Sequence, residues 1–166
     1  KSPNYVYSSP VAPKLKLLLK NSKLSDDISF RFSNPDWASY PLTADKYIDW
    51  IASLPEEEQL VNLFMNYETF GEMQPRESGI FEFMKALPRF AAEKGIEFAF
   101  GAEMEFYLFK LDEYGQPTTL PHDQAGYMDI APDDKGEHIR REICLMLEQM
   151  GIRPESSHHE SGPGQN

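Results

Sequence analysis

Apolar and polar residues alternate most regularly between Phe98 and Phe109. The even positions of this stretch are apolar, whereas the odd positions place Glu103 and Glu105 on the opposite side. A period of two residues, together with several aromatic side chains, predicts a β-strand with one apolar and one acidic face. We expect the rest of the chain to be organised around this strand.

Three other stretches carry apolar residues at helical spacing, namely residues 43–54, 78–94 and 134–150. Glycines follow the second and third of them at Gly95 and Gly151, where a glycine commonly ends a helix. The pattern therefore predicts three amphipathic helices with defined C-terminal ends.

Shorter extended segments are expected at two places. Apolar and polar residues alternate in Ile28–Phe32, whereas Leu60–Asn66 is almost continuously apolar, like a buried parallel strand. Residues 14–20 predict a short strand or loop with solvated lysines. The order strand, loop, helix, strand predicts an α/β fold, with α+β also open for the C-terminal part.

Composition narrows the possible partners. The chain has 166 residues, 27 of them acidic and 16 basic, for a net charge of -11. So acidic a protein argues against a nucleic-acid partner, and no apolar run is long enough to span a bilayer. A single cysteine, Cys144, and the lack of a visible secretory signal indicate a cytoplasmic protein that acts on small molecules, with no membrane partner.

The two glutamates of the central strand suggest a metal site. On one face of a strand they lie roughly 7 Å apart, so they repel unless a cation or water screens them. Oxygen-only ligands favour Mg or Mn over Zn. The alternative is that both glutamates simply lie on the solvent-exposed face of a sheet, and these residues alone do not decide between the two.

Several separated motifs then agree in order along the C-terminal part of the chain. They are Glu103-Met-Glu-Phe106, Gly126-Tyr-Met-Asp129, His159-Glu160 and Gly164-Gln-Asn166. From about Gly95 to its last residue the chain resembles the catalytic domain of glutamine synthetase. The resemblance implies half a sheet of that fold, ATP as co-substrate, and ligation of ammonia to glutamate.

Carried over residue by residue, the resemblance makes Glu103 and Glu105 look like ligands of two different metal ions. Glu160 looks like a second ligand of the ion held by Glu105. Glu155 looks like a carboxylate on the nucleotide side, and His158 like a histidine on the substrate side. A three-ligand zinc site at His158–Glu160 is the weaker alternative, because adjacent histidines in a strand point to opposite faces.

One departure from that family matters. The family continues the Gly-Gln-Asn motif with another metal-binding glutamate, whereas this sequence stops at Asn166. Later arginines and phosphate-binding elements of the family are likewise not in the sequence, so we expect an incomplete site without turnover. Glutamine synthetases place their active sites between subunits, which leaves a homo-oligomer possible.

A second set of motifs lies upstream and points elsewhere. Between about residues 14 and 94 the chain resembles glycoside hydrolase family 57, an α-amylase-type family built on an incomplete (β/α) barrel. The matching segments are Leu17–Asp27, Phe30–Asn34, Pro41–Lys46, Leu63–Glu72 and Gly79–Phe83. This resemblance implies a barrel fragment and cleavage or transfer of α-glucans.

Here too the chain departs from the family, at two positions. Its acid/base carboxylate is an Asp two residues before a Glu, and the equivalent residues here are Asn66 and Glu68. Met73 stands where a histidine is expected. An amide cannot donate and recover a proton, so the acid step of retaining glycoside cleavage is not expected.

The sequence therefore predicts two partial domains, 1–94 of the family 57 type and 95–166 of the glutamine synthetase type. Three explanations compete: a deliberate chimera, fragments joined that do not belong together, or a natural protein in which one resemblance is accidental. Three functional hypotheses follow, namely a glutamine synthetase-type ligase, an α-glucan hydrolase or transferase, and a non-enzymatic composite chain.

Overall fold

The computed structural model describes residues 2–58 and 60–166. The chain divides into two compact units, unit 1 (Lys1–Phe100) and unit 2 (Gly101–Asn166). In the part of the chain that is described, no helix is long and apolar enough to cross a membrane.

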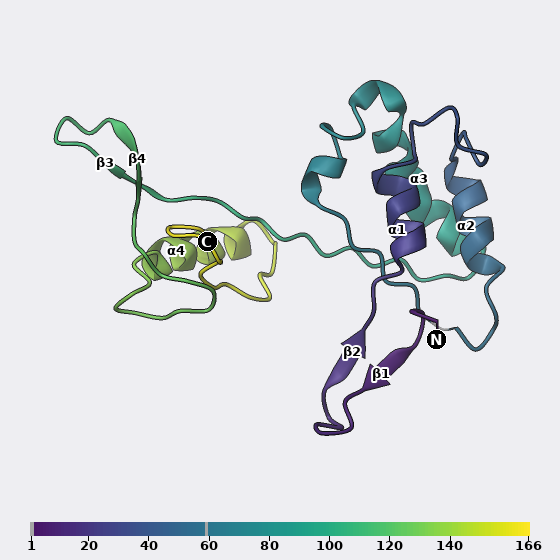
Figure 1. Cartoon of the computed structure of the whole chain (residues 1–166), viewed down its shortest axis with the longest axis horizontal. Coiled ribbons are helices and arrows are strands. Elements are labelled where there is room, and N and C mark those ends of the chain that lie inside the picture. Colours follow the sequence, from purple (N-terminus) through teal and green to yellow (C-terminus); the bar gives the residue numbers. More distant parts are fainter. Residues whose placement is uncertain (1, 59) are drawn as a thin grey trace. The chain divides into compact units, whose positions relative to one another are not determined.

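Unit 1 combines a hairpin with a small group of helices (Figure 1). Strands β1 (Val6–Ser8) and β2 (Lys16–Leu18) pair antiparallel, with Val6 opposite Leu18 and Ser8 opposite Lys16. The helices are α1 (Ser22–Ser29), α2 (Ala44–Ala52), the short 3-10 helices η1 (Tyr67–Thr69) and η2 (Arg76–Ser78), and α3 (Ile80–Glu93).

The core of unit 1 forms where α1, α2 and α3 turn their apolar sides toward one another. Phe83 of α3 lies edge-on to Phe32 at 5.0 Å and to Tyr47 at 5.7 Å, and the Tyr47 hydroxyl donates to the Leu24 carbonyl at 2.9 Å. The buried apolar residues are Leu24, Ile28, Phe32, Leu42, Ala44, Tyr47, Ile48, Ile80, Phe83, Leu87 and Ala91. Their spacing by three and four residues within each helix explains why these segments are helical.

The helix predictions are confirmed, and so are the glycine ends. After α3, Gly95 has φ +72°, its N–H donates to Ala92 O at 3.0 Å, and the Ile96 N–H donates to Ala91 O at 2.9 Å. This pair of bonds is the Schellman arrangement, which needs a residue in the left-handed region. Gly151 ends the helix of unit 2 in the same way, with φ +82°.

Two strand predictions in unit 1 are wrong. Residues 28–32 are not a strand, because Asn21 caps α1 by accepting the Leu24 N–H at 3.0 Å and the helix runs on to Ser29. The predicted buried strand at 60–66 forms only one parallel bridge, between Asn62 and Lys20. Since α1 begins two residues after Lys20, no extended neighbour is left for this segment to pair with.

Unit 2 contains a second hairpin and one helix. Strands β3 (Phe109–Leu111) and β4 (Pro117–Pro121) pair antiparallel with an irregular register, and helix α4 spans Glu137–Gln149. The C-terminal residues run back antiparallel to the start of this hairpin. The Phe106 N–H donates to Asn166 O at 2.9 Å, and the Leu108 N–H donates to Gly164 O at 2.7 Å.

The central strand predicted at 98–109 is therefore wrong over most of its length. Only residues from Phe106 onward have an extended neighbour, and residues 98–105 have no regular secondary structure. The alternation survives at its end, where Phe106 and Leu108 are half-buried while Tyr107 and Phe109 are exposed. A strand needs a partner for its backbone groups, and the alternating pattern cannot supply one.

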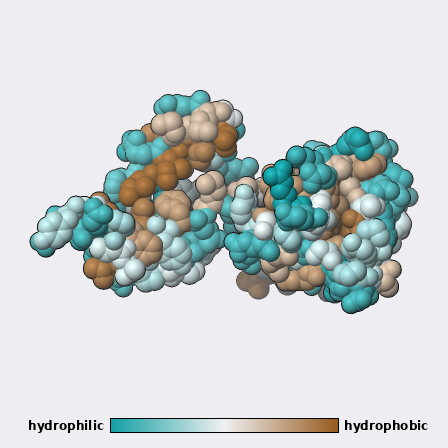
Figure 2. Space-filling view, turned by 90° about the horizontal axis from the view of Figure 1, so that it is seen from above, coloured by the Kyte–Doolittle hydropathy of each residue, from teal (hydrophilic) through white to brown (hydrophobic). Residues whose placement is uncertain are grey.

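At the level of fold class, the described residues contain helices and small antiparallel sheets and no closed barrel. This mixture agrees with α/β or α+β, whereas the barrel fragment stays a prediction. Much apolar surface remains open, as the brown atoms in Figure 2 show. On α4, Ile143 and Met146 are 39% and 56% exposed, and Met150, directly after the helix, is 67% exposed.

Candidate functional site

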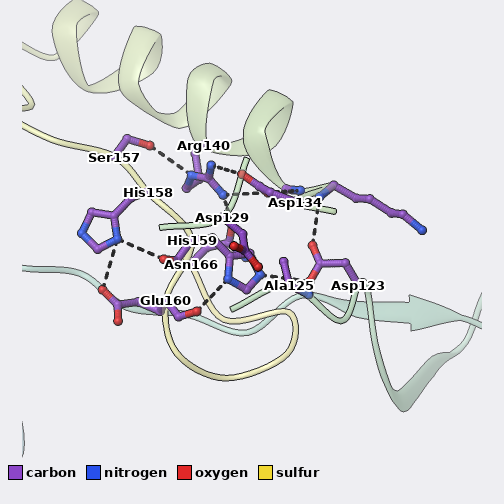
Figure 3. Close-up of polar contacts among 12 residues, drawn as sticks. Asp123, Ala125, Asp129, Asp134, Arg140, Ser157, His158, His159, Glu160 and Asn166 are labelled. Carbon is purple, nitrogen blue, oxygen red and sulfur yellow. Dashed lines mark hydrogen bonds and ion pairs between the residues drawn. The ribbon is translucent and has the colours of Figure 1, made fainter. Parts of the chain in front are cut away.

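The interior of unit 2 is polar rather than apolar (Figure 3). Among its described residues Ala125 is the one buried apolar side chain, whereas five polar or charged side chains are buried: Asp123, Asp134, Arg140, His159 and Asn166. Buried charges are tolerated only where they are paired and hydrogen-bonded, so their bonds determine how this unit is organised.

Asp123 and His159 form the first buried pair. The Asp123 carboxylate receives the His159 Nε2 at 2.9 Å, the Gly164 N–H at 3.1 Å and the Lys135 N–H at 3.0 Å. Burial works against its ionisation, but hydrogen bonds from Lys135, His159, Gly164 and Ala125 prevail and lower the pKa of Asp123 to about 2. The carboxylate therefore joins three separate segments of the chain while ionised.

The His159 ring lies between two acceptors. Its Nδ1 is 2.7 Å from the Glu160 carbonyl oxygen, and its Nε2 faces Asp123. A carbonyl and a carboxylate can only accept, so both ring nitrogens donate, which requires the imidazolium form. Burial lowers the pKa of His159, but the hydrogen bonds to Asp123 and Glu160 outweigh burial and raise it.

The second buried pair fixes the start of α4. Arg140 is 8% exposed, and its Nη2 lies 2.5 Å from Asp134 Oδ2. Arg140 also donates to Ser157 Oγ at 3.2 Å and to the Asn166 side-chain oxygen. The hydrogen bond and charge of Arg140 lower the pKa of Asp134. Arg140 thus lies on the buried side of α4, whereas the adjacent Arg141 is exposed.

Three of the residues singled out by the sequence gather around the turn at residues 160–165. The Gln165 side-chain amide donates to Glu105 Oε2 at 2.8 Å, and the Gln165 backbone carbonyl accepts the Glu160 N–H at 2.9 Å. His158 Nδ1 lies 3.5 Å from Glu160 Oε1, and its ring meets Tyr127 edge-on at 5.2 Å. Gln165 therefore joins Glu105 to the turn that carries Glu160.

The other two site residues make no hydrogen bond or ion pair with this group among the described contacts. Glu103 and Glu155 are both exposed and occur in segments without regular secondary structure. Within residues 2–58 and 60–166, no group of three or more His, Cys, Asp or Glu side chains is close enough to hold a metal ion. The proposed ligands thus offer suitable oxygen donors but are not preassembled around one point.

In unit 1, Asn66 immediately precedes η1 and is exposed. Its side-chain amide donates to Glu68 Oε1 at 3.2 Å, which fixes the amide as a donor toward the neighbouring carboxylate. A hollow of about 130 Å³ lies beside it, lined in part by Phe64, Thr69 and Met73.

Sequence reasoning missed the buried network of unit 2. It gave Asp123, Asp134 and Arg140 no functional role. The available signal was the six-residue spacing of Asp134 and Arg140 across the helix start. That spacing is common on surfaces, so only the fold distinguishes a buried pair from a solvated one.

Comparison with known families gives two matches on this one chain. Residues 1–114 match glycosyl hydrolase family 57, and residues 74–166 match the glutamine synthetase catalytic domain. Each match covers more than half of the sequence, and the two overlap at residues 74–114. The chain therefore belongs to both families and is a composite of the two.

Individual proteins of both families are also similar to this chain. A putative alpha-amylase of Methanocaldococcus jannaschii is 58% identical over 88 residues, which are 53% of this chain and 18% of that protein. A glutamine synthetase of Staphylococcus epidermidis is 37% identical over 160 residues, 92% of this chain and 35% of the relative. One of Staphylococcus aureus is 56% identical over 70 residues, 42% of this chain and 16% of the relative. The chain thus spans between about a sixth and about a third of the length of these relatives.

Proposed function

We propose that the glutamine synthetase-like part of this chain binds Mg²⁺ or Mn²⁺ through Glu103, Glu105 and Glu160, and that the 166 residues by themselves turn over no substrate. The observation that supports cation binding most directly is the link through Gln165, which holds Glu105 beside the turn of Glu160. Both glutamates are open to solvent at least in part, so a cation has access to them.

The donor chemistry fits the proposed ions. Carboxylate oxygens are the ligands that Mg²⁺ and Mn²⁺ prefer. When bound, such an ion neutralises phosphate charge on a nucleotide such as ATP. In this proposal Glu155 lies on the nucleotide side and His158, held against Tyr127, on the side of a small substrate. Because the ligands are not preassembled, binding costs side-chain ordering and is weak.

Catalytic turnover is not part of the proposal. The chain spans 35% of the Staphylococcus epidermidis glutamine synthetase, so most of the groups that such an enzyme can use are outside this alignment. In the family 57 part, the Asn66 amide donates a hydrogen bond to Glu68. An amide N–H cannot be transferred to a glycosidic oxygen as the proton of a carboxylic acid can. We therefore propose no glucan cleavage either.

The test is a Mn²⁺ titration of the full chain followed by calorimetry and by paramagnetic broadening of backbone amide signals. We expect weak binding, with broadening centred on residues 103–105 and 158–160. The triple variant Glu103→Ala, Glu105→Ala and Glu160→Ala should lose the heat, whereas Glu113→Ala, an exposed glutamate of the same unit, should keep it. Equal heats for all three proteins would refute the metal site.

Two activity assays run in parallel. Neither γ-glutamyl transfer nor cleavage of a soluble α-glucan should exceed the background without protein. Measurable turnover of either substrate would contradict the proposed lack of turnover, and glucan cleavage would also contradict the interpretation of Asn66.

A further inference from the structure

The N-terminal hairpin carries a charge opposite to that of the rest of the protein. The first 25 residues contain five lysines and no aspartate or glutamate, so all 27 acidic residues follow them. Three of these lysines, Lys14, Lys16 and Lys20, belong to the second half of the β1–β2 hairpin and its exit. An acidic chain with one basic end is typical of a protein that binds an anionic surface there.

The same hairpin exposes apolar side chains that the charge pattern alone does not reveal. Val11 at its tip is 94% exposed, more than any other large apolar side chain among the described residues. The others exposed on the hairpin and its exit are Val6, Leu15, Leu17, Leu18 and Leu19. Figure 1 shows the hairpin extending away from the three helices of unit 1. So many exposed apolar side chains on one short hairpin indicate an interaction site.

The backbone of the tip is poor in free donors. Pro10 and Pro13 have no N–H, the Ala12 N–H donates to Ser9 Oγ at 3.3 Å, and the Leu15 N–H donates to Ala12 O at 2.9 Å. Moving a peptide group out of water is costly when its N–H has no partner. The sequence Pro-Val-Ala-Pro at the tip therefore reduces the cost of leaving water for an apolar phase.

The sequence alone predicts no membrane partner, but the exposure of this hairpin points the other way. We propose that the β1–β2 hairpin binds the surface of a bilayer that contains anionic lipids. The tip at residues 10–13 enters the interface between head groups and acyl chains, while Lys14, Lys16 and Lys20 contact lipid phosphates. Lys16 contacts Ser8 Oγ at 2.9 Å and Lys20 contacts Asp26 at 3.6 Å, and both side chains lie at the surface. Lysines can exchange such contacts for phosphates while their alkyl chains cover apolar surface.

A lipid surface satisfies both properties of the hairpin, whereas the alternatives satisfy one. A nucleic acid complements the lysines but offers nothing to Val11 and the leucines. A purely apolar protein groove takes the tip but leaves the lysines without anions. The acidic remainder of the chain is repelled by an anionic bilayer, which restricts the contact to the hairpin and makes it sensitive to salt.

The experiment is flotation of the full-length chain with two kinds of vesicle, one of phosphatidylcholine alone and one of an equimolar mixture with phosphatidylglycerol. We expect binding to the mixed vesicles only, weakened by added salt. Val11→Asp, and separately the pair Lys14→Gln and Lys16→Gln, should each weaken binding by about tenfold or more.

Two control variants carry the same kinds of substitution outside the hairpin. Ile130→Asp alters a side chain that is 78% exposed in unit 2, and Lys85→Gln removes an exposed lysine of α3; both should bind like the unaltered protein. Far-UV circular dichroism verifies that each variant folds. Val11→Asp should fold, because the Val11 side chain is 94% exposed and contributes little to the core.

Three outcomes would overturn the inference. The first is equal binding to both vesicles or to neither, and the second is equal loss of binding in the control variants. The third is preferential binding of single-stranded DNA over the mixed vesicles, which would make a nucleic acid the partner. Metal titration reports on Glu103, Glu105 and Glu160 in unit 2, so failure of this inference and failure of the metal proposal are separate results.

Discussion

Asp123 joins the segments of unit 2 because four donors converge on one buried carboxylate. His159 Nε2 and the backbone N–H groups of Ala125, Lys135 and Gly164 all point to it. Removing such a carboxylate leaves a buried imidazolium and several buried N–H groups without acceptors. Loss of one partner of a buried ion pair typically costs about 3–5 kcal/mol.

The opposite pKa shifts of this pair predict a stability maximum in mildly acidic solution. Asp123 has its pKa lowered from 3.8 to about 2, so its contribution is complete above about pH 4 and is lost as the pH falls toward 2. His159 has its pKa raised above 6.5, so its contribution is complete below that pH and is lost as the pH rises through the higher folded value. Amide hydrogen exchange in unit 2 should therefore be slowest between about pH 4 and 6.5, after correction for the intrinsic rate.

Two variants test this assignment. Asp123→Asn should remove most of the loss of protection at acidic pH, because it should lower the free energy of unfolding of unit 2 above about pH 4, where the Asp123 carboxylate contributes fully, and change it little near pH 2. His138→Gln, which alters an exposed histidine of α4, should leave the profile unchanged. A protection profile that is flat from pH 3 to 9 in the unaltered protein would show that the pair does not contribute as described.

At the scale of single elements, the helices depend on local signals and the strands depend on distant neighbours. The three long helices carry their own hydrogen bonds, and Gly95 and Gly151 end two of them at the positions expected. The predicted strands at 60–66 and 98–109 found neighbours only at Asn62 and from Phe106 onward. Alternation identifies which face of a strand is apolar, but pairing requires another segment at the correct distance and in the correct direction.

Gly95 gives the clearest test of a local signal. Gly95→Ala forces an L-residue into φ +72°, so unit 1 should lose about 1 kcal/mol of unfolding free energy. Gly101→Ala is the matched control, because that glycine has no positive φ and an added Cβ meets nothing within 4 Å. Urea unfolding followed by tryptophan fluorescence measures the difference, since Trp37 and Trp50 both belong to unit 1. Equal midpoints for the two variants would contradict the role of Gly95.

At the scale of the whole molecule, the two units are stabilised by different means. Unit 1 has an apolar core of eleven residues with interlocking aromatic rings. Unit 2 buries two ion pairs and one alanine among its described residues. Buried ion pairs contribute little net stability compared with apolar packing, so unit 2 should be the less stable of the two.

Substitution in the core of unit 1 should therefore affect one unfolding transition and not the other. Leu87→Ala removes a side chain that is 1% exposed, and should lower the stability of unit 1 by about 2–5 kcal/mol. The tryptophan-detected midpoint should fall, while hydrogen exchange at residues 123–126 and 159–166 of unit 2 stays the same. A parallel loss of protection in unit 2 would show that the units unfold together.

The sequence by itself determined the two family memberships, the helices α2, α3 and α4 with their ends, and the residue types able to bind a cation, but not helix α1. These properties depend on residue identity, order and local periodicity, all of which can be read along one chain. Only the tertiary structure decided that residues 98–105 lack a strand partner, that Arg140 is buried, and that Gln165 joins Glu105 to the turn of Glu160. Pairing and burial depend on which distant segments meet, and that information is not contained in any single stretch of the sequence.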